Sequence, residues 1–164
     1  MDLFPWILWL HIFGAIVAFG PTFAFSVIGG MGGKEPMHAN FATRVTEKIE
    51  RGIVLPLAAV QGLTGLALLL MSGRNLTVST NYWLGVAIVL YLIALGFSYF
   101  GQLRRVEALV HLSSTPPPAP ASGVAPSGPP PALLAAVKAV QQGGIFLTVM
   151  IVSIIFLMVV KPGS

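Results

Sequence analysis

Four long apolar stretches dominate this sequence. They run over residues 6–28, 52–71, 82–101 and 144–160, and none of them contains Asp, Glu, Lys or Arg. A helix needs about 20 apolar residues to cross the hydrocarbon of a bilayer, so all four can span a membrane. The fourth is the shortest, and we expect its helix to start further back, near Leu133. The sequence therefore predicts an all-α, polytopic membrane protein built as a four-transmembrane-helix bundle.

The composition agrees with this architecture and excludes several functions. Of 164 residues, 55% are hydrophobic and 9% are charged, whereas a soluble domain has roughly 25% charged residues. The net charge of +4 is explained by basic residues outside the hydrocarbon, so we predict a lipid bilayer and no nucleic acid as partner. Without cysteine, disulfides and thiol catalysis are excluded. No catalytic motif is present, so catalytic residues stay unknown and enzymatic activity uncertain.

Basic residues are distributed unevenly between the connections. Seven follow the first or third stretch: Lys34, Arg44, Lys48, Arg51, Arg104, Arg105 and Lys138. The opposite side has two, Arg74 and Lys161. Because basic residues are retained in the cytoplasm, we expect both termini outside and residues 29–51 and 102–143 cytoplasmic. Trp6, Trp9, Tyr82 and Trp83 would then lie near the outer interface, which favours aromatic rings.

The connection after the first stretch has two parts. Glycine-rich residues 29–33 predict a hinge, because ordering glycine costs much backbone freedom. From Asn40, expected to be an N-cap, apolar residues recur every four positions, and Glu47 can pair with Arg51. This pattern predicts a short amphipathic helix at the membrane or leading into it, with a bend at Pro56 before the second span.

The connection after the third stretch is rich in proline. Residues 113–131 contain eight prolines in 19 positions and show no apolar periodicity. This composition predicts a disordered or polyproline-like spacer, although docking of a partner on it stays an alternative.

His11 is a candidate site residue, because polar side chains are costly in hydrocarbon. On a helix it shares a face with the small residues Gly14, Ala15, Ala18 and Thr22, which would let a partner helix or a planar ligand approach closely. Its imidazole could be a metal ligand to haem iron or a hydrogen-bond partner to a quinone headgroup. Alternatively it bonds to a neighbouring helix or to interfacial water. No second axial ligand is evident.

Two further polar residues lie in the spans. Gln61 is near the centre of the second stretch and is expected to bond across helices, with a ligand contact as the alternative. Thr22 follows Pro21, which predicts a kink in the first helix, and its hydroxyl can satisfy a freed backbone group. Around a cofactor held by His11, Gln61 and Thr22 would be nearby hydrogen-bonding groups.

Three segments carry a resemblance to a known family. They are LHIFGAIVAFG in the first stretch, EPMHANFATRVTEKIERGIVLPLAAVQGLTGLALL before and within the second, and FLMVVKP at the end of the fourth. Together they resemble bacterial integral membrane proteins of the domain of unknown function 2269 family, over most of the chain. The resemblance implies the bacterial inner (cell) membrane as the location. The family has no settled activity.

A wider set of four-helix membrane proteins is similar in having an early histidine followed by small residues. It includes copper-resistance D-like proteins and the membrane-bound protoporphyrinogen oxidase, a haem-binding enzyme with a proposed histidine iron ligand in its first helix. By this resemblance His11 is the matching position. The oxidase is also expected to supply a basic residue from a later helix, whereas here Arg104 and Arg105 follow the third stretch only at its cytoplasmic border.

Two functional hypotheses follow. The first is a small redox membrane protein associated with haem or a quinone through His11, Gln61 and Thr22. The second is a non-enzymatic structural or accessory subunit, which packs as a homo-oligomer or within a larger membrane complex. A transporter relay of carboxylates is disfavoured, because the four stretches contain none.

Overall fold

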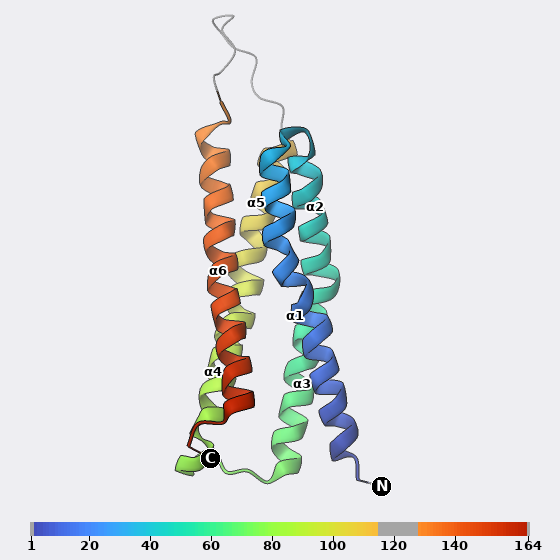
Figure 1. The fold of residues 1–164 in the computed structure, drawn as a ribbon, viewed down its shortest axis with the longest axis vertical. Coiled ribbons are helices and arrows are strands. Elements are labelled where there is room, and N and C mark those ends of the chain that lie inside the picture. The colour runs from blue at the N-terminus through green and yellow to red at the C-terminus, as the bar shows by residue number, and fades with distance from the viewer. Residues whose placement is uncertain (1, 115–127, 164) are drawn as a thin grey trace, which may run out of the picture.

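The computed structural model describes residues 2–114 and 128–163, and Figure 1 shows four long helical columns side by side with both termini at one end. The columns are α1 (Phe4–Lys34), α2 with α3 (Ala39–Ile49, Leu55–Ser72), α4 with α5 (Tyr82–Phe97, Leu103–Ser114) and α6 (Pro131–Val160). Each is long and apolar enough to cross a membrane. Since the described residues form no strand, the predicted all-α four-helix membrane protein is confirmed.

Two of the columns contain a π-helical turn. The turn η2 (Glu50–Val54) joins α2 to α3, and η4 (Ser98–Gln102) joins α4 to α5. At the end of each turn a backbone N–H reaches back five residues, from Leu55 to Glu50 and from Leu103 to Ser98. A π turn takes up an extra residue without leaving the helix, which keeps the backbone hydrogen bonded. A bend was predicted at Pro56; the helix continues there, with Pro56 in the first turn of α3, directly after the π turn η2.

The packing of the columns differs between the two halves of the bundle. In the half that holds the termini, α1 packs against α3, and α4 packs chiefly against α6. In the other half, α2 contacts both α1 and α5, and α5 also contacts α6. The second and third columns are therefore joined above the π turns, through α2 and α5, and diverge below them, where α3 and α4 have little contact (Figure 1).

The helix α2 is the predicted amphipathic helix, and it leads directly into the second span. The predicted pair of Glu47 and Arg51 is present at 3.5 Å, and Arg51 also pairs with Glu107 on α5. The N-cap prediction was wrong, because His38 precedes the helix, after the short turn η1 (Pro36–His38). Asn40 instead donates to the hydroxyls of Ser113 and Ser114 on α5, at 3.0 and 2.8 Å. The Asn40 hydrogen bonds near the start of α2 and the Arg51 ion pair just after its end therefore both hold α2 against α5.

The predicted hinge at residues 29–33 was also wrong, because α1 continues through them to Lys34. Gly32 is buried, and a methyl group on its Cα would lie 2.9 Å from Cβ of Ala42 on α2. Only glycine allows the two backbones to approach this closely, and close backbone approach is what favours helix association in lipid. Contact with α2 therefore offsets the cost of about 1 kcal/mol for a glycine in a helix.

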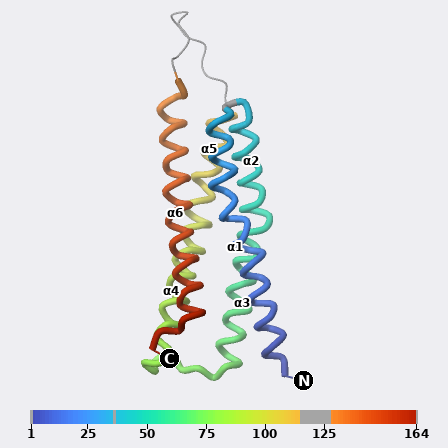
Figure 2. Tube along the Cα trace, viewed as in Figure 1, coloured from blue at the N-terminus to red at the C-terminus, as the bar shows by residue number. Residues whose placement is uncertain are grey.

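Pro21 lies inside α1 as predicted, and the trace of α1 changes direction along its length (Figure 2). A proline cannot donate its backbone nitrogen and disturbs the preceding turn. The helix nevertheless remains continuous from Phe4 to Lys34.

The four aromatic residues predicted near the outer interface lie at the start of α1 and of α4, and they differ in exposure. Trp6, Trp9 and Tyr82 are exposed on the helices, but Trp83 is only 4% exposed. The Trp83 indole N–H donates to the carbonyl of Thr80 in the turn η3 (Ser79–Asn81) at 3.1 Å. The charged ends of Arg74 and Lys161 both lie 5.9 Å from its ring centroid. Trp83 thus holds together the α3–α4 connection and the C-terminal end of α6.

Most of the predicted proline-rich spacer, residues 113–131, lies outside the described residues. Of its two ends, Ser113 and Ser114 complete α5, and Pro131 begins α6. The start of α6 confirms that the fourth helix extends back beyond the apolar stretch, past Leu133.

The contact of α1 with α2 can be tested with Gly32→Leu. The new side chain would collide with Ala42, so we expect the free energy of unfolding in detergent to fall by about 1–3 kcal/mol. Gly33→Leu is the matched control, because a Cβ there meets nothing within 4 Å. Equal effects of the two substitutions, measured by chemical denaturation, would show that Gly32 is not a packing position.

Candidate functional site

The most polar contact between α1 and α3 is formed by His11, Gln61 and Thr64. The His11 Nδ1 atom lies 2.8 Å from the hydroxyl of Thr64, and its Nε2 atom lies 3.1 Å from the amide nitrogen of Gln61. We call these three residues the His11 cluster. Gln61 and Thr64 are buried and one turn apart on α3, and His11 is half-buried.

The hydrogen bonds within the cluster define the roles of the two ring nitrogens. The Thr64 hydroxyl can donate to the carbonyls of Val60 and Gln61, at 3.1 and 3.0 Å. It is therefore free to accept from Nδ1–H of His11, while Nε2 accepts from the Gln61 amide. This arrangement uses a neutral imidazole in which both nitrogens are engaged across the helix interface.

One polar atom of the cluster has no hydrogen-bond partner. Among the described residues, the Oε1 atom of Gln61 is a buried oxygen to which no group donates. A Cβ on Gly14 of α1 would lie 3.0 Å from this oxygen, and one on Gly65 of α3 would lie 3.1 Å from Cε1 of His11. The two glycines thus keep side-chain atoms away from both the oxygen and the ring. A buried acceptor without a donor costs about 1–3 kcal/mol, which makes this oxygen unusual.

The structure brings together two of the three predicted site residues. Gln61 bonds across helices to His11, as expected, so the two residues lie at the same level of the bundle. Thr22 does not take part: it lies eleven positions further along α1, and its hydroxyl donates to the carbonyl of Phe19 at 2.6 Å. Thr64 was missed, although its spacing of three from Gln61 puts both on one helix face.

A haem does not fit the cluster as it is packed. Iron ligation needs a free imidazole nitrogen, and both nitrogens of His11 have partners on α3. Within the described ranges, no three His, Cys, Asp or Glu side chains are grouped so that they could hold a metal. His38 pairs with Glu35 at 2.9 Å, in an exposed position. Haem ligation by His11 would therefore require Gln61 or Thr64 to move away.

A second buried polar group joins the two π turns. The Glu50 side chain is 3% exposed, and one of its oxygens lies 3.4 Å from the hydroxyl of Ser98. No carboxylate lies within residues 52–71, as the sequence showed, but the helix begins earlier and Glu50 is enclosed by the bundle. Glu50 was not predicted to be buried, because the charged residues beside it in the sequence are typical of a solvated connection.

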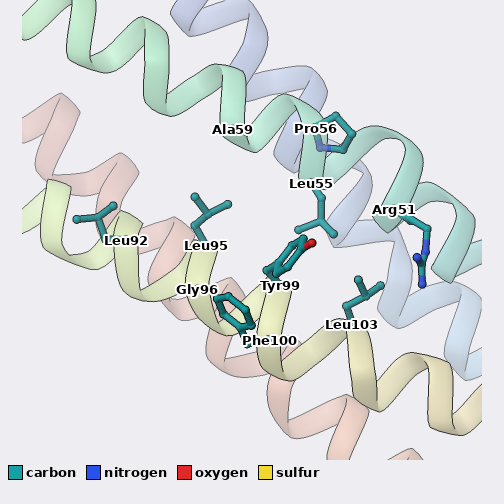
Figure 3. Close-up of a pocket in the computed structure, with 10 residues that line it drawn as sticks. All are labelled: Arg51, Leu55, Pro56, Ala59, Leu92, Leu95, Gly96, Tyr99, Phe100 and Leu103. Atoms are coloured by element: carbon teal, nitrogen blue, oxygen red, sulfur yellow. The ribbon is translucent and has the colours of Figure 1, made fainter.

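An open groove of about 640 Å³ lies between α3 and α4, directly beside the π turns (Figure 3). Its walls are apolar and include Leu55 and Ala59 of α3 and Leu92 and Leu95 of α4. Arg51 stands at one end and Tyr99 lines the same region (Figure 3). The groove uses a different face of α3 from the one that carries Gln61 and Thr64.

Thr64→Val tests the bond from α3 to His11. Valine keeps the shape but leaves Nδ1–H without an acceptor, so we expect the free energy of unfolding to fall by about 0.6–1.7 kcal/mol, the range for hydrogen bonds between helices in membranes. Thr148→Val is the control, since the Thr148 hydroxyl donates to the carbonyl of Gly144 within its own helix at 2.9 Å. Identical losses in chemical denaturation would contradict a stabilising bond to His11.

The comparisons with known proteins agree with this architecture. No curated protein and no solved structure matches the chain. The family model described as "Predicted integral membrane protein (DUF2269)" matches residues 5–162, a range that includes all four helical columns and the His11 cluster. The chain therefore belongs to this family of integral membrane proteins.

Proposed function

We propose that this protein is a redox-associated membrane protein that binds a quinone-class headgroup between α1 and α3. The observation that carries the proposal is the Gln61 Oε1 atom, a buried acceptor without a donor beside an imidazole. A quinol hydroxyl is a donor of the kind that this oxygen lacks. Gly14 brings the α1 backbone close to this oxygen, since a Cβ there would lie 3.0 Å from it, so a headgroup would bind where α1 and α3 separate at Gly14.

The cluster can serve either redox form of such a headgroup. With Nδ1–H donated to Thr64, the Gln61 oxygen is available as an acceptor, as a quinol requires. If the Gln61 amide turns over and the imidazole proton moves to Nε2, the Gln61 N–H becomes the available group, as a quinone carbonyl requires. Bound quinone would supply the electron transfer, and the protein's part is to hold and orient the headgroup and to place a proton on either ring nitrogen.

Of the two cofactors that the sequence suggested, the geometry favours a quinone over haem. A quinone needs hydrogen-bonding groups, and the cluster offers an unpaired one. A haem iron needs a free ring nitrogen, which the cluster does not offer as packed.

A non-enzymatic accessory subunit is the second candidate. The observation in its favour is that both ring nitrogens of His11 already bond to side chains on α3. The cluster can therefore have a purely structural role, which is to hold α1 against α3. In this case the apolar groove between α3 and α4 would receive part of a partner, from a second copy or a larger membrane complex.

We further propose that the protein lies in the bacterial inner membrane with both termini outside. Both termini lie at one end of the bundle (Figure 1). Seven of the nine Lys and Arg residues lie toward the opposite end, at the end of α1, in α2, η2 and α5, and in the first turns of α6, which fits the retention of basic residues in the cytoplasm.

Gln61→Leu tests the proposal, with Gln102→Leu as a matched control. Gln102 is also a buried glutamine whose Oε1 has no partner, but its amide donates to Val140 on α6 at 3.1 Å. We expect lipid extracts of the purified wild type and the Gln102→Leu variant to contain quinone in proportion to protein. Gln61→Leu and His11→Ala should lose it, because they remove the groups that hold the headgroup.

Visible spectra of the same samples separate the candidates. We expect no His11-dependent Soret band in the oxidised or dithionite-reduced wild type. A Soret band that is present in the wild type and disappears in His11→Ala would show that the bound cofactor is haem and not a quinone. A colourless protein without quinone, in which Gln61→Leu only lowers stability, would favour the accessory subunit.

A further inference from the structure

Glu50 combines deep burial with a shortage of hydrogen-bond donors. Its side chain is enclosed where η2 meets η4, and within the described parts of the chain its one hydrogen-bond donor is the Ser98 hydroxyl at 3.4 Å, beyond the usual length for a hydroxyl donor. An ionised carboxylate can accept about four hydrogen bonds and is costly to bury without them. The site is therefore poorly suited to a bare negative charge.

The neighbouring cations do not compensate this charge. Arg51 follows Glu50 in η2, but its guanidinium pairs with Glu47 on α2 and Glu107 on α5. Arg105 on α5 donates to the Ala139 carbonyl at 3.3 Å and lies over the Phe97 ring. The other basic residues on the elements around Glu50 are all exposed: Lys34 near the end of α1, Arg44 and Lys48 on α2, Arg104 on α5 and Lys138 on α6.

The same region holds a buried oxygen that no group donates to among the described residues. Gln102 ends the η4 turn that Ser98 begins, is 5% exposed, and its Oε1 atom is buried and unpaired. With Glu50, the two π turns thus present more buried acceptors than donors. A shortage of donors among buried oxygens is relieved by a proton, which turns one carboxyl oxygen into a donor.

Glu50 lies at a place in the fold where binding or release of a proton can change how the helices pack. The second and third columns pack together through α2 and α5. Below η2 and η4 they diverge and the groove opens, and α4 is bonded to α3 by the Tyr91 hydroxyl, which donates to the carbonyl of Ala58 at 2.7 Å. The contact of Glu50 with Ser98 joins them at this point of divergence. π turns inside α-helices are also frequent at functional sites.

We infer that Glu50 is a proton-binding site at the junction of the two π turns. Protonated Glu50 can donate a hydrogen bond to the Ser98 hydroxyl and holds η2 against η4. Release of the proton leaves a buried negative charge without a partner, which favours separation of the two turns and entry of water from the groove side. The ligand of this site is a proton, and the site is independent of the His11 cluster.

Infrared spectroscopy of the full-length protein in lipid bilayers tests this inference. Ordinary solvent-exposed glutamates have lost their protons at about pH 6, so a carboxylic acid C=O band at that pH reports a shielded carboxyl. We expect such a band in the wild type, its absence in Glu50→Gln, and its loss from the wild type as the pH is raised. Glu47→Gln, which changes the glutamate one turn earlier on α2, should keep the band.

A second variant keeps the inference testable if Glu50→Gln does not fold. Ser98→Ala keeps Glu50 but removes its hydroxyl partner, so we expect the band to remain and to move to the frequency of a carboxyl without that hydrogen bond. A wild type with no carboxylic acid band at about pH 6 would overturn the inference. A band that survives in Glu50→Gln would do the same, because it would belong to another group.

Discussion

The absence of water inside a bilayer is the constraint on which this structure depends. Every backbone N–H and C=O within the hydrocarbon must find its partner in the protein, and a helix does this within one segment. The four columns therefore remain helical even where the sequence disfavours a helix. Pro21 is accommodated inside α1, the glycines at 29–33 stay helical, and the disturbance before Pro56 becomes a π turn instead of a break.

The same constraint explains how the columns associate. Lipid chains are as apolar as leucine, so burial of apolar surface adds little, and helices are held by close approach and by hydrogen bonds between them. Gly32 brings α1 against α2, and the His11 cluster joins α1 to α3 beside Gly14 and Gly65. Where such contacts are few, between α3 and α4, the columns diverge and the groove remains.

Both proposed sites lie where these polar contacts leave an acceptor unsatisfied. In the His11 cluster it is the amide oxygen of Gln61, which has no donor, and at the π turns it is the carboxyl of Glu50, which has only the long hydrogen bond from Ser98 among the described residues. The two sites need different partners. The Gln61 oxygen would accept a hydrogen bond from the hydroxyl of a ligand, and the Glu50 carboxylate would bind a proton. Glu50 begins η2, whereas Gln61 and Thr64 lie further along the second column on α3, so each site can be tested by its own substitutions.

The sequence alone determined the four spans, the amphipathic helix before the second span and the candidacy of His11 and Gln61, because apolar length and isolated polar residues are local properties of the chain. Only the tertiary structure decided that residues 29–33 are helical, that Thr64 rather than Thr22 joins His11, and that Glu50 is buried. Each of these depends on a second helix: Ala42 lies against Gly32, α3 brings its hydroxyl to the imidazole, and η4 covers the carboxyl. Helical periodicity places a residue on one face of its own helix, but which helix covers that face is set by the packing of the whole bundle.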